Sequence, residues 1–242
     1  MKAIILAAGR GSRMDKHTEE KPKCMVEFKG KPLLQWQFDA IGEAGISEIG
    51  IVRGYMKHKI SSGYGVYFDN DNWNSTNSVM SLYMADEWLS RYECVCTYSD
   101  IVFSPDIITK TMGVQSEIAL PYNQNWLKLW SLRFENPLED LEHFQTDPSG
   151  VLTKIGGRPG SLDEIMGQYM GIFKLKPNGW SRMKTHINKL DEAEKNKLDI
   201  TSLLAKMLEY GEEIMCIPTD GFWVEIDSSE DLVAYEDKEM FF

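Results

Sequence analysis

Residues 2–13 read Lys2-Ala-Ile-Ile-Leu-Ala-Ala-Gly-Arg-Gly-Ser-Arg13. The apolar run from Lys2 to Leu6 predicts a buried strand. This run opens into small residues that let backbone N–H groups approach a ligand closely: Ala7, Ala8, Gly9 and Gly11. Taken alone, the stretch is equally consistent with a glycine-rich turn that only joins a strand to a helix.

The residues around this turn narrow the kind of site it can form. The Gly-x4-Gly-Lys-Ser/Thr spacing of a P-loop is absent, and Met14 stands where a dinucleotide-binding fingerprint has its third glycine. Two cations lie nearby, Arg13 and the Lys23 of Lys21-Pro22-Lys23. They are placed to neutralise phosphate groups, unless both are solvated surface residues.

Strand and helix patterns alternate through the first half of the chain. Strands are expected at 48–52, 66–68 and 94–98, and helices at 32–44, 55–60 and 78–90. Such alternation is typical of βαβ units in a largely parallel sheet.

The second half has a different pattern, because its expected strands are separated mainly by turns. Strands are expected at 117–120, 130–134, 151–155, 169–173 and 214–217, and helices at 180–190, 200–210 and 229–235. The segment 221–227, which ends at Asp227, precedes the last helix as a further strand. We therefore predict an α/β fold: a mixed, mostly parallel sheet flanked by helices, with a small, more antiparallel part. Residues 1–242 are expected to form one domain, with a nucleotide-binding half up to about 110 and an acceptor-binding half beyond it.

Composition excludes several classes of function. A net charge of −11 and a pI near 4.9 argue against nucleic acid as the main partner. The four cysteines lack a metal-binding spacing, and the four histidines are scattered. No export signal and no apolar run of about 18 residues is present, so we expect a cytoplasmic protein without a membrane span.

Two aspartates are candidates for a metal site. Asp100 and Asp227 each follow an expected strand, so both fall at the carboxyl edge of the predicted sheet. Two carboxylates that meet there can hold one or two Mg²⁺ ions through oxygen ligands. The alternative is that each caps the helix that follows it.

The glycine-rich start with Lys21-Pro22-Lys23 closely resembles the signature of the sugar-nucleotidyltransferase superfamily. This resemblance implies a Rossmann-like nucleotidyltransferase fold. Three further segments resemble its phosphocholine and phosphonate cytidylyltransferase branch: residues 74–82, 98–100 and 225–232. The resemblance implies that Asp100 and Asp227 bind Mg²⁺ and that Arg13 and Lys23 stabilise charge on the α-phosphate and pyrophosphate. It also implies a nucleotide site built from Leu6, Ala7, Ala8, Gly9, Gly11, Asn77, Ser81 and Tyr98.

The resemblance implies an acceptor phosphate site in residues 150–159, where Gly157 and Arg158 replace the glutamate and lysine of the family's Glu-Lys-Pro. Lys154 or Arg158 is expected to contact the phosphate or phosphonate, and the replacement puts a sugar acceptor in doubt. Aromatic and acidic residues from position 126 onward are suited to bind an ammonium group. The alternative is that the tryptophans belong to the core and the acidic residues to a solvated loop. The acceptor candidates are Trp130, Arg133, Glu142, Gln168 and Tyr169.

Together these features predict transfer of CMP from CTP to a small phosphonate or phosphate monoester, with release of pyrophosphate. Aminoethylphosphonate, a phosphorylated amino acid and phosphocholine are the acceptors considered. The attacking oxygen is already anionic, so positioning and charge neutralisation suffice without a general base. The alternatives are a hexose-1-phosphate thymidylyl- or uridylyltransferase and a non-catalytic nucleotide-binding module. The oligomeric state is open, with a homodimer as one option.

Overall fold

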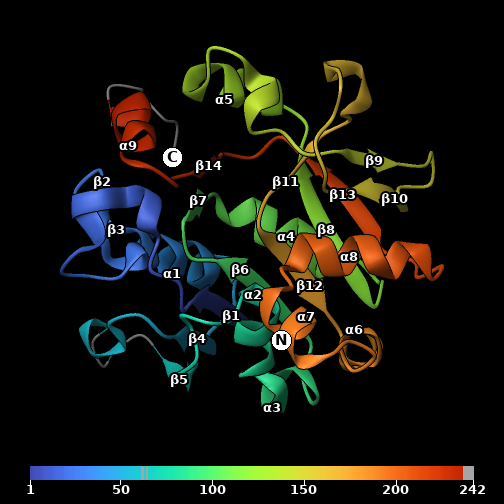
Figure 1. Ribbon diagram of the computed structural model, residues 1–242, viewed down its shortest axis with the longest axis horizontal. Helices are drawn as coiled ribbons and strands as arrows, with labels where there is room; N and C mark the ends of the chain where they lie inside the picture. Colours follow the sequence, from blue (N-terminus) through green and yellow to red (C-terminus); the bar gives the residue numbers. More distant parts are fainter. Residues whose placement is uncertain (61–62, 64, 237–242) are drawn as a thin grey trace.

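The computed structural model describes residues 1–60, 63 and 65–236, and Figure 1 shows a central sheet with helices on both faces. Seven strands of this eight-stranded sheet follow the order β11-β8-β12-β6-β1-β4-β5, and β13 pairs with β8. The strands are β1 Lys2–Ala7, β4 Ile49–Arg53, β5 Val66–Asp69, β6 Cys94–Tyr98, β8 Ile118–Asn123, β11 Gln168–Tyr169, β12 Ile172–Leu175 and β13 Met215–Thr219.

The sheet is parallel across β5, β4, β1 and β6, and β12 then pairs antiparallel with both β6 and β8. The expected mixed, mostly parallel sheet is confirmed. Three two-stranded ribbons stand apart: β2 Glu27–Phe28 with β3 Lys31–Pro32, β7 Ile101–Phe103 with β14 Trp223–Glu225, and β9 Phe144–Thr146 with β10 Leu152–Ile155.

The α-helices of the described residues are α1 Leu33–Glu43, α2 Ser78–Tyr83, α3 Asp86–Leu89, α4 Pro105–Gly113, α5 Trp126–Arg133, α6 Pro177–Ile187, α7 Glu192–Lys197, α8 Ile200–Glu209 and α9 Ser229–Glu236. Short 3-10 helices cover Ser12–Thr18, Lys23–Met25, Lys57–Lys59, Pro137–Glu139 and Leu162–Glu164. No helix in the described ranges is long and apolar enough to cross a membrane.

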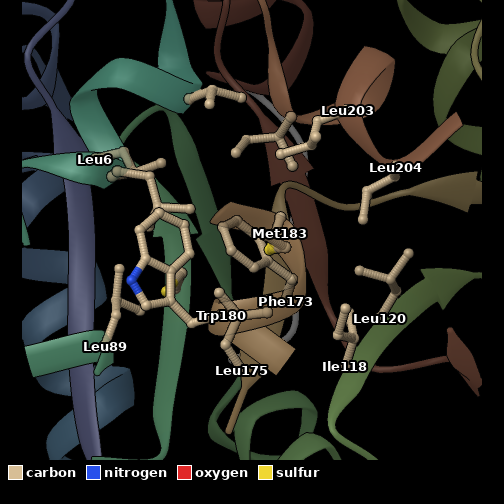
Figure 2. Close-up of a cluster of buried hydrophobic side chains, with 14 of the residues drawn as sticks. Leu6, Leu89, Ile118, Leu120, Phe173, Leu175, Trp180, Met183, Leu203 and Leu204 are labelled. Carbon is tan, nitrogen blue, oxygen red and sulfur yellow. The ribbon is translucent and has the colours of Figure 1, made fainter. Parts of the chain in front are cut away.

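Alternation along β1 builds a core on each face of the sheet. Ile4 and Leu6 join the cluster formed with α2, α6 and α8, whereas Ala3 and Ile5 join the one formed with α1 and α4. Figure 2 shows part of the first cluster, with the indole of Trp180 from α6 among its aliphatic side chains. A smaller cluster joins α9 to the segment after β1.

Four expected elements differ from the structure. The predicted strand at 130–134 is wrong, because these residues belong to helix α5 and its end. Trp126 and Trp130, four residues apart, share the buried face, while Leu132 is 39% exposed. The expected helix at 78–90 is two helices, and the one at 55–60 is only the 3-10 turn Lys57–Lys59. The expected strand at 169–173 is interrupted at Gly171, whose φ is 67°; β11 before it pairs with β8, whereas β12 after it begins against β6.

Candidate active site

A cavity of about 660 Å³ lies over the carboxyl ends of β1 and β6. Parallel neighbours end at the same edge of a sheet, which is where open α/β sheets place their ligand sites. The walls come from the loop after β1, the start of α2, the end of β6, and from β10 and α8 of the second half of the chain.

The loop after β1 needs glycine at position 11. Gly11 has φ +71°, a left-handed conformation that costs other residues free energy. A Cβ at this position would also lie 2.6 Å from Cδ of Lys23. The glycine therefore permits the turn and leaves room for the Lys23 stem, which crosses the loop on its way into the cavity.

Lys23 joins the two candidate metal aspartates. Its ammonium lies 2.8 Å from Oδ2 of Asp100 and is also hydrogen-bonded to Oδ1 of Asp227. Arg13 forms an ion pair with the other oxygen of Asp227. Burial lowers the pKa of Lys23, but the charges and hydrogen bonds of the two carboxylates outweigh burial and raise it above its usual value.

Asp100 and Asp227 are 127 positions apart, and the β7–β14 ribbon brings them together. Glu225 is the register partner of Ile101, and the N–H of Ile226 donates to the carbonyl of Asp100 at 2.8 Å. Asp227 therefore reaches the cavity on the ribbon beside the main sheet, whereas Asp100 follows β6 directly. The expectation that Asp227 follows a strand of the main sheet is wrong.

The alternative role of both aspartates as helix caps is also wrong. Ser104 is the N-cap of α4, so Asp100 lies outside that helix. At the start of α9, Oδ2 of Asp231 accepts the N–H of Ser228 at 2.9 Å, and Oγ of Ser228 accepts the N–H of Asp231 at 3.3 Å. This is a capping box, and it leaves the Asp227 carboxylate directed at Lys23 and Arg13.

Seven of the eight residues expected to bind the nucleotide line the cavity: Leu6, Ala8, Gly9, Gly11, Asn77, Ser81 and Tyr98. The eighth, Ala7, is buried in the cluster beneath α1. The amide of Asn77 already caps α2 and donates to the carbonyl of Lys197, while Oγ of Ser81 accepts from Asn70. These side chains thus shape the wall as well as facing the cavity.

The residues expected to bind the acceptor divide into two groups. Glu142 lines the cavity, and burial, then Asp199 and Asp140, raise the pKa of its carboxyl. Gln168 lies behind it and donates to its backbone carbonyl at 2.7 Å. Tyr169 packs edge-on against Tyr98, with 6.1 Å between ring centroids.

Like Gln168 and Tyr169, four other candidates do not line the cavity. Trp130 stacks on Trp223 with 6.0 Å between ring centroids, as a core residue. Arg133 is buried in ion pairs with Asp231 and Glu225 rather than exposed on a strand. Lys154 and Arg158 are exposed on either side of Ile155, Gly156 and Gly157, which do line the cavity.

Sequence analysis missed a group of lining residues at the start of α8 and before α2: Asp199, Thr201, Ser202, Trp73 and Thr76. Asp199 is the N-cap of α8, since its carboxylate accepts the N–H of Ser202 at 2.7 Å. The spacing Asp199-x-x-Ser202 is a recognisable helix start, but nothing in the sequence indicates that this start faces the first half of the chain.

Comparison with known proteins gives the following relatives. Residues 3–148 match the family model of the MobA-like NTP transferase domain. The CTP:phosphoglutamine cytidylyltransferase of Campylobacter jejuni is 34% identical, with 98% of this chain and 100% of the relative covered. The choline-phosphate cytidylyltransferase of Streptococcus pneumoniae is 42% identical over 95 residues, which are 38% of this chain and 42% of the relative.

Solved structures share the whole fold at low sequence identity. The CTP:phosphocholine cytidylyltransferase of Streptococcus pneumoniae superposes with a TM-score of 0.73 at 20% identity, covering 98% of this chain and 97% of that one. A glucose-1-phosphate thymidylyltransferase from Bacillus anthracis, described as putative, has a TM-score of 0.77 at 18% identity and covers 100% and 97%. At these identities the likeness concerns the fold alone.

Proposed function

The chain belongs to the MobA-like NTP transferase family, as its resemblance to nucleotidyltransferases implied, and we propose that it transfers CMP from CTP to a small acceptor that carries a phosphate or phosphonate and an ammonium group. Pyrophosphate is the second product. The relative that is similar over nearly its whole length is named as a cytidylyltransferase, which supports CTP as the donor.

The observation that carries the proposal is the meeting of two cations and two carboxylates at one end of the cavity. Lys23 contacts both Asp100 and Asp227, Arg13 contacts Asp227, and all four line the cavity. Cations placed this way stabilise the charge that builds up on a triphosphate during transfer, and carboxylates hold its metal. A protein that only binds nucleotides has no need for both.

Asp100 and Asp227 fit a divalent cation such as Mg²⁺. Oδ1 of Asp100 is buried without a hydrogen-bond partner among the described residues, so one ligand oxygen is free. The described residues contain no group of three or more acidic, His or Cys side chains at ligand spacing. Two carboxylates, completed by phosphate oxygens and water, match the way proteins bind Mg²⁺. When bound, the ion supplies charge neutralisation to the phosphates.

The chain's own residues then act by positioning and charge. Backbone groups of Ala8 and Gly9 approach the nucleotide, while Lys23 and Arg13 shift from the aspartates toward the α-phosphate and the leaving pyrophosphate. An anionic oxygen of the acceptor attacks the α-phosphorus in line, forming the new P–O bond as the bond to the β-phosphate breaks. No proton transfer is needed, because the attacking oxygen is already ionised.

Acceptor recognition is assigned to the part of the wall that carries Glu142 and Asp199. Glu142 and Asp199 both line the cavity, and within the described residues neither carboxylate has an ion-pair partner. Two carboxylates close to one another are stabilised by a cation, which an ammonium group on the acceptor provides. The role of Arg158 and Lys154 as contacts to the acceptor phosphate stays a prediction, since both lie on the rim next to Gly157.

The proposal is tested by pyrophosphate release from CTP and an ammonium-bearing phosphate acceptor with Mg²⁺. Asp100→Asn and Asp227→Asn are expected to remain folded and lose most turnover. Asp106→Asn, an exposed residue of α4, is the matched control and is expected to retain it. Full turnover by both active-site variants would overturn the assignment of the two carboxylates.

A further inference from the structure

The segment that carries Asp227 is held by a buried ion pair outside the cavity. Oδ2 of Asp231 accepts the backbone N–H of Asp227 at 2.9 Å and that of Ser228 at 2.9 Å. One carboxylate oxygen therefore fixes two consecutive peptide groups at the point where β14 gives way to α9. The position of the Asp227 side chain depends on these two bonds, because no strand of the main sheet supports this segment.

Asp231 is itself held by Arg133 of helix α5, which lies beside α9 in Figure 1. Nε of Arg133 lies 2.6 Å from Oδ1 of Asp231, and Nη2 lies 3.1 Å from Oδ2. The side chains are 3% and 4% exposed, so solvent screens the pair weakly. This two-bond geometry sets both the distance and the orientation of the carboxylate.

The guanidinium also reaches the strand before Asp227. Its Nη1 lies 3.1 Å from Oε2 of Glu225, two residues before Asp227, and 3.7 Å from Oδ2 of Asp140. Arg133 thus binds side chains on both sides of Asp227, at Glu225 and Asp231. Its positive charge also reduces the repulsion between these carboxylates.

We propose that Arg133 and Asp231 are positioning residues that hold the Asp227 carboxylate where it binds the metal of the metal–CTP complex. Neither faces the cavity, so their effect on the reaction passes through Asp227. This inference rests on the metal role given to Asp227 in the proposed function. Residues that orient metal ligands from behind commonly change metal affinity by about 10- to 100-fold when altered.

The test compares Arg133→Met, Arg133→Lys and Asp231→Asn with Arg182→Met. Arg182 pairs with Glu212 away from the cavity, so its variant controls for loss of an ion pair. Binding of Mn²⁺–CTP is followed by water-proton relaxation, and the Mg²⁺ concentration for half-maximal pyrophosphate release is measured in parallel. A loss of folded protein lowers the number of binding sites without changing the affinity of those that remain.

We expect Arg133→Met and Asp231→Asn to weaken Mn²⁺–CTP binding and to raise the half-maximal Mg²⁺ concentration by about 10-fold or more. Arg133→Lys is expected to restore this only in part, because an ammonium cannot form the two-bond contact. Arg182→Met should stay within about 2-fold of wild type. If Arg133→Met does not fold, Asp231→Asn decides the matter.

Two results separate the possible failures. Wild-type affinity in folded Arg133→Met and Asp231→Asn would overturn the positioning role while leaving the proposed function intact. A wild-type protein that binds no Mn²⁺–CTP would instead contradict the metal role of Asp227, and with it the premise of this inference.

Discussion

Replacing Lys23 by Met tests the charge balance at the centre of the cavity. The Lys23 side chain is 6% exposed, and its ammonium neutralises Asp100 and Asp227, whose side chains are 21% and 10% exposed. Methionine keeps an apolar stem of similar length beside Gly11 but removes the charge. The two carboxylates are then left facing each other, with Arg13 as a partner that is itself 70% exposed.

The expected loss follows from the burial of the pair. Removing one partner of a buried ion pair costs about 3–5 kcal/mol, and the partial exposure of Asp100 places this case near the lower end, at about 3 kcal/mol. For a chain of this size, 1 kcal/mol corresponds to about 2–4 °C in Tm, so Lys23→Met should melt about 6–12 °C below wild type in EDTA. Mg²⁺ should restore part of the lost Tm, because a divalent cation replaces the missing positive charge.

Thermal unfolding at pH 7 in EDTA and in millimolar Mg²⁺ measures both effects. Lys110→Met is the control, since the Lys110 pair with Asp220 is exposed and should shift Tm by no more than about 2 °C. A Lys23→Met variant that melts within about 2 °C of wild type in EDTA, or that gains no more from Mg²⁺ than wild type does, would refute this account.

Three further predictions concern the loop, the acceptor wall and the core. Gly11→Ala should reduce kcat, because it adds about 1–2 kcal/mol of left-handed strain and its Cβ displaces the Lys23 side chain. Pyrophosphate release at the wild-type rate would contradict the close packing of Lys23 against position 11. The KM for an ammonium-bearing acceptor should fall as pH rises through the raised pKa of Glu142, because the ionised carboxylate binds the cation; a Glu142→Gln variant with the same pH profile would exclude this role. Trp130→Phe should lower Tm but leave the acceptor KM unchanged, because Trp130 packs on Trp223 outside the cavity; an altered KM would restore it as an acceptor residue.

The half of the fold that carries the glycine loop was predictable because its patterns are local. The run from Lys2 to Leu6 opens into small residues and glycines, and this pattern predicts both the strand and the cavity edge that the structure has. Asp100 follows its strand directly, so its place at this edge was predictable too. Asp227 arrives on the β7–β14 ribbon, and the sequence contains no sign of which strands pair.

The second half was harder to predict because the spacing of its apolar residues fits both the repeat of a strand and the repeat of a helix. Trp130, Leu132 and Phe134 alternate like a strand, yet Trp126 and Trp130 share the buried face of helix α5. The same uncertainty led Arg133 to be assigned to the acceptor, when it is buried against Asp231. Helix α7 was missed because it has no buried face, although the capping box of Asp191 and Glu194 marks its start.

The acceptor wall shows a third limit on prediction from sequence. Glu142 was anticipated from the acidic residues near it, but Asp199 was not, because the two meet only when α8 packs against β10. Such contacts between distant segments depend on tertiary packing rather than on any local pattern.

The most direct measurement of the central claim is pyrophosphate release with each of the four nucleoside triphosphates against a panel of acceptors. The panel contains phosphocholine, aminoethylphosphonate, phosphorylated amino acids and glucose 1-phosphate. The proposed function predicts turnover with CTP and at least one ammonium-bearing acceptor, and little or none with glucose 1-phosphate. Faster release from UTP or dTTP with glucose 1-phosphate would contradict it.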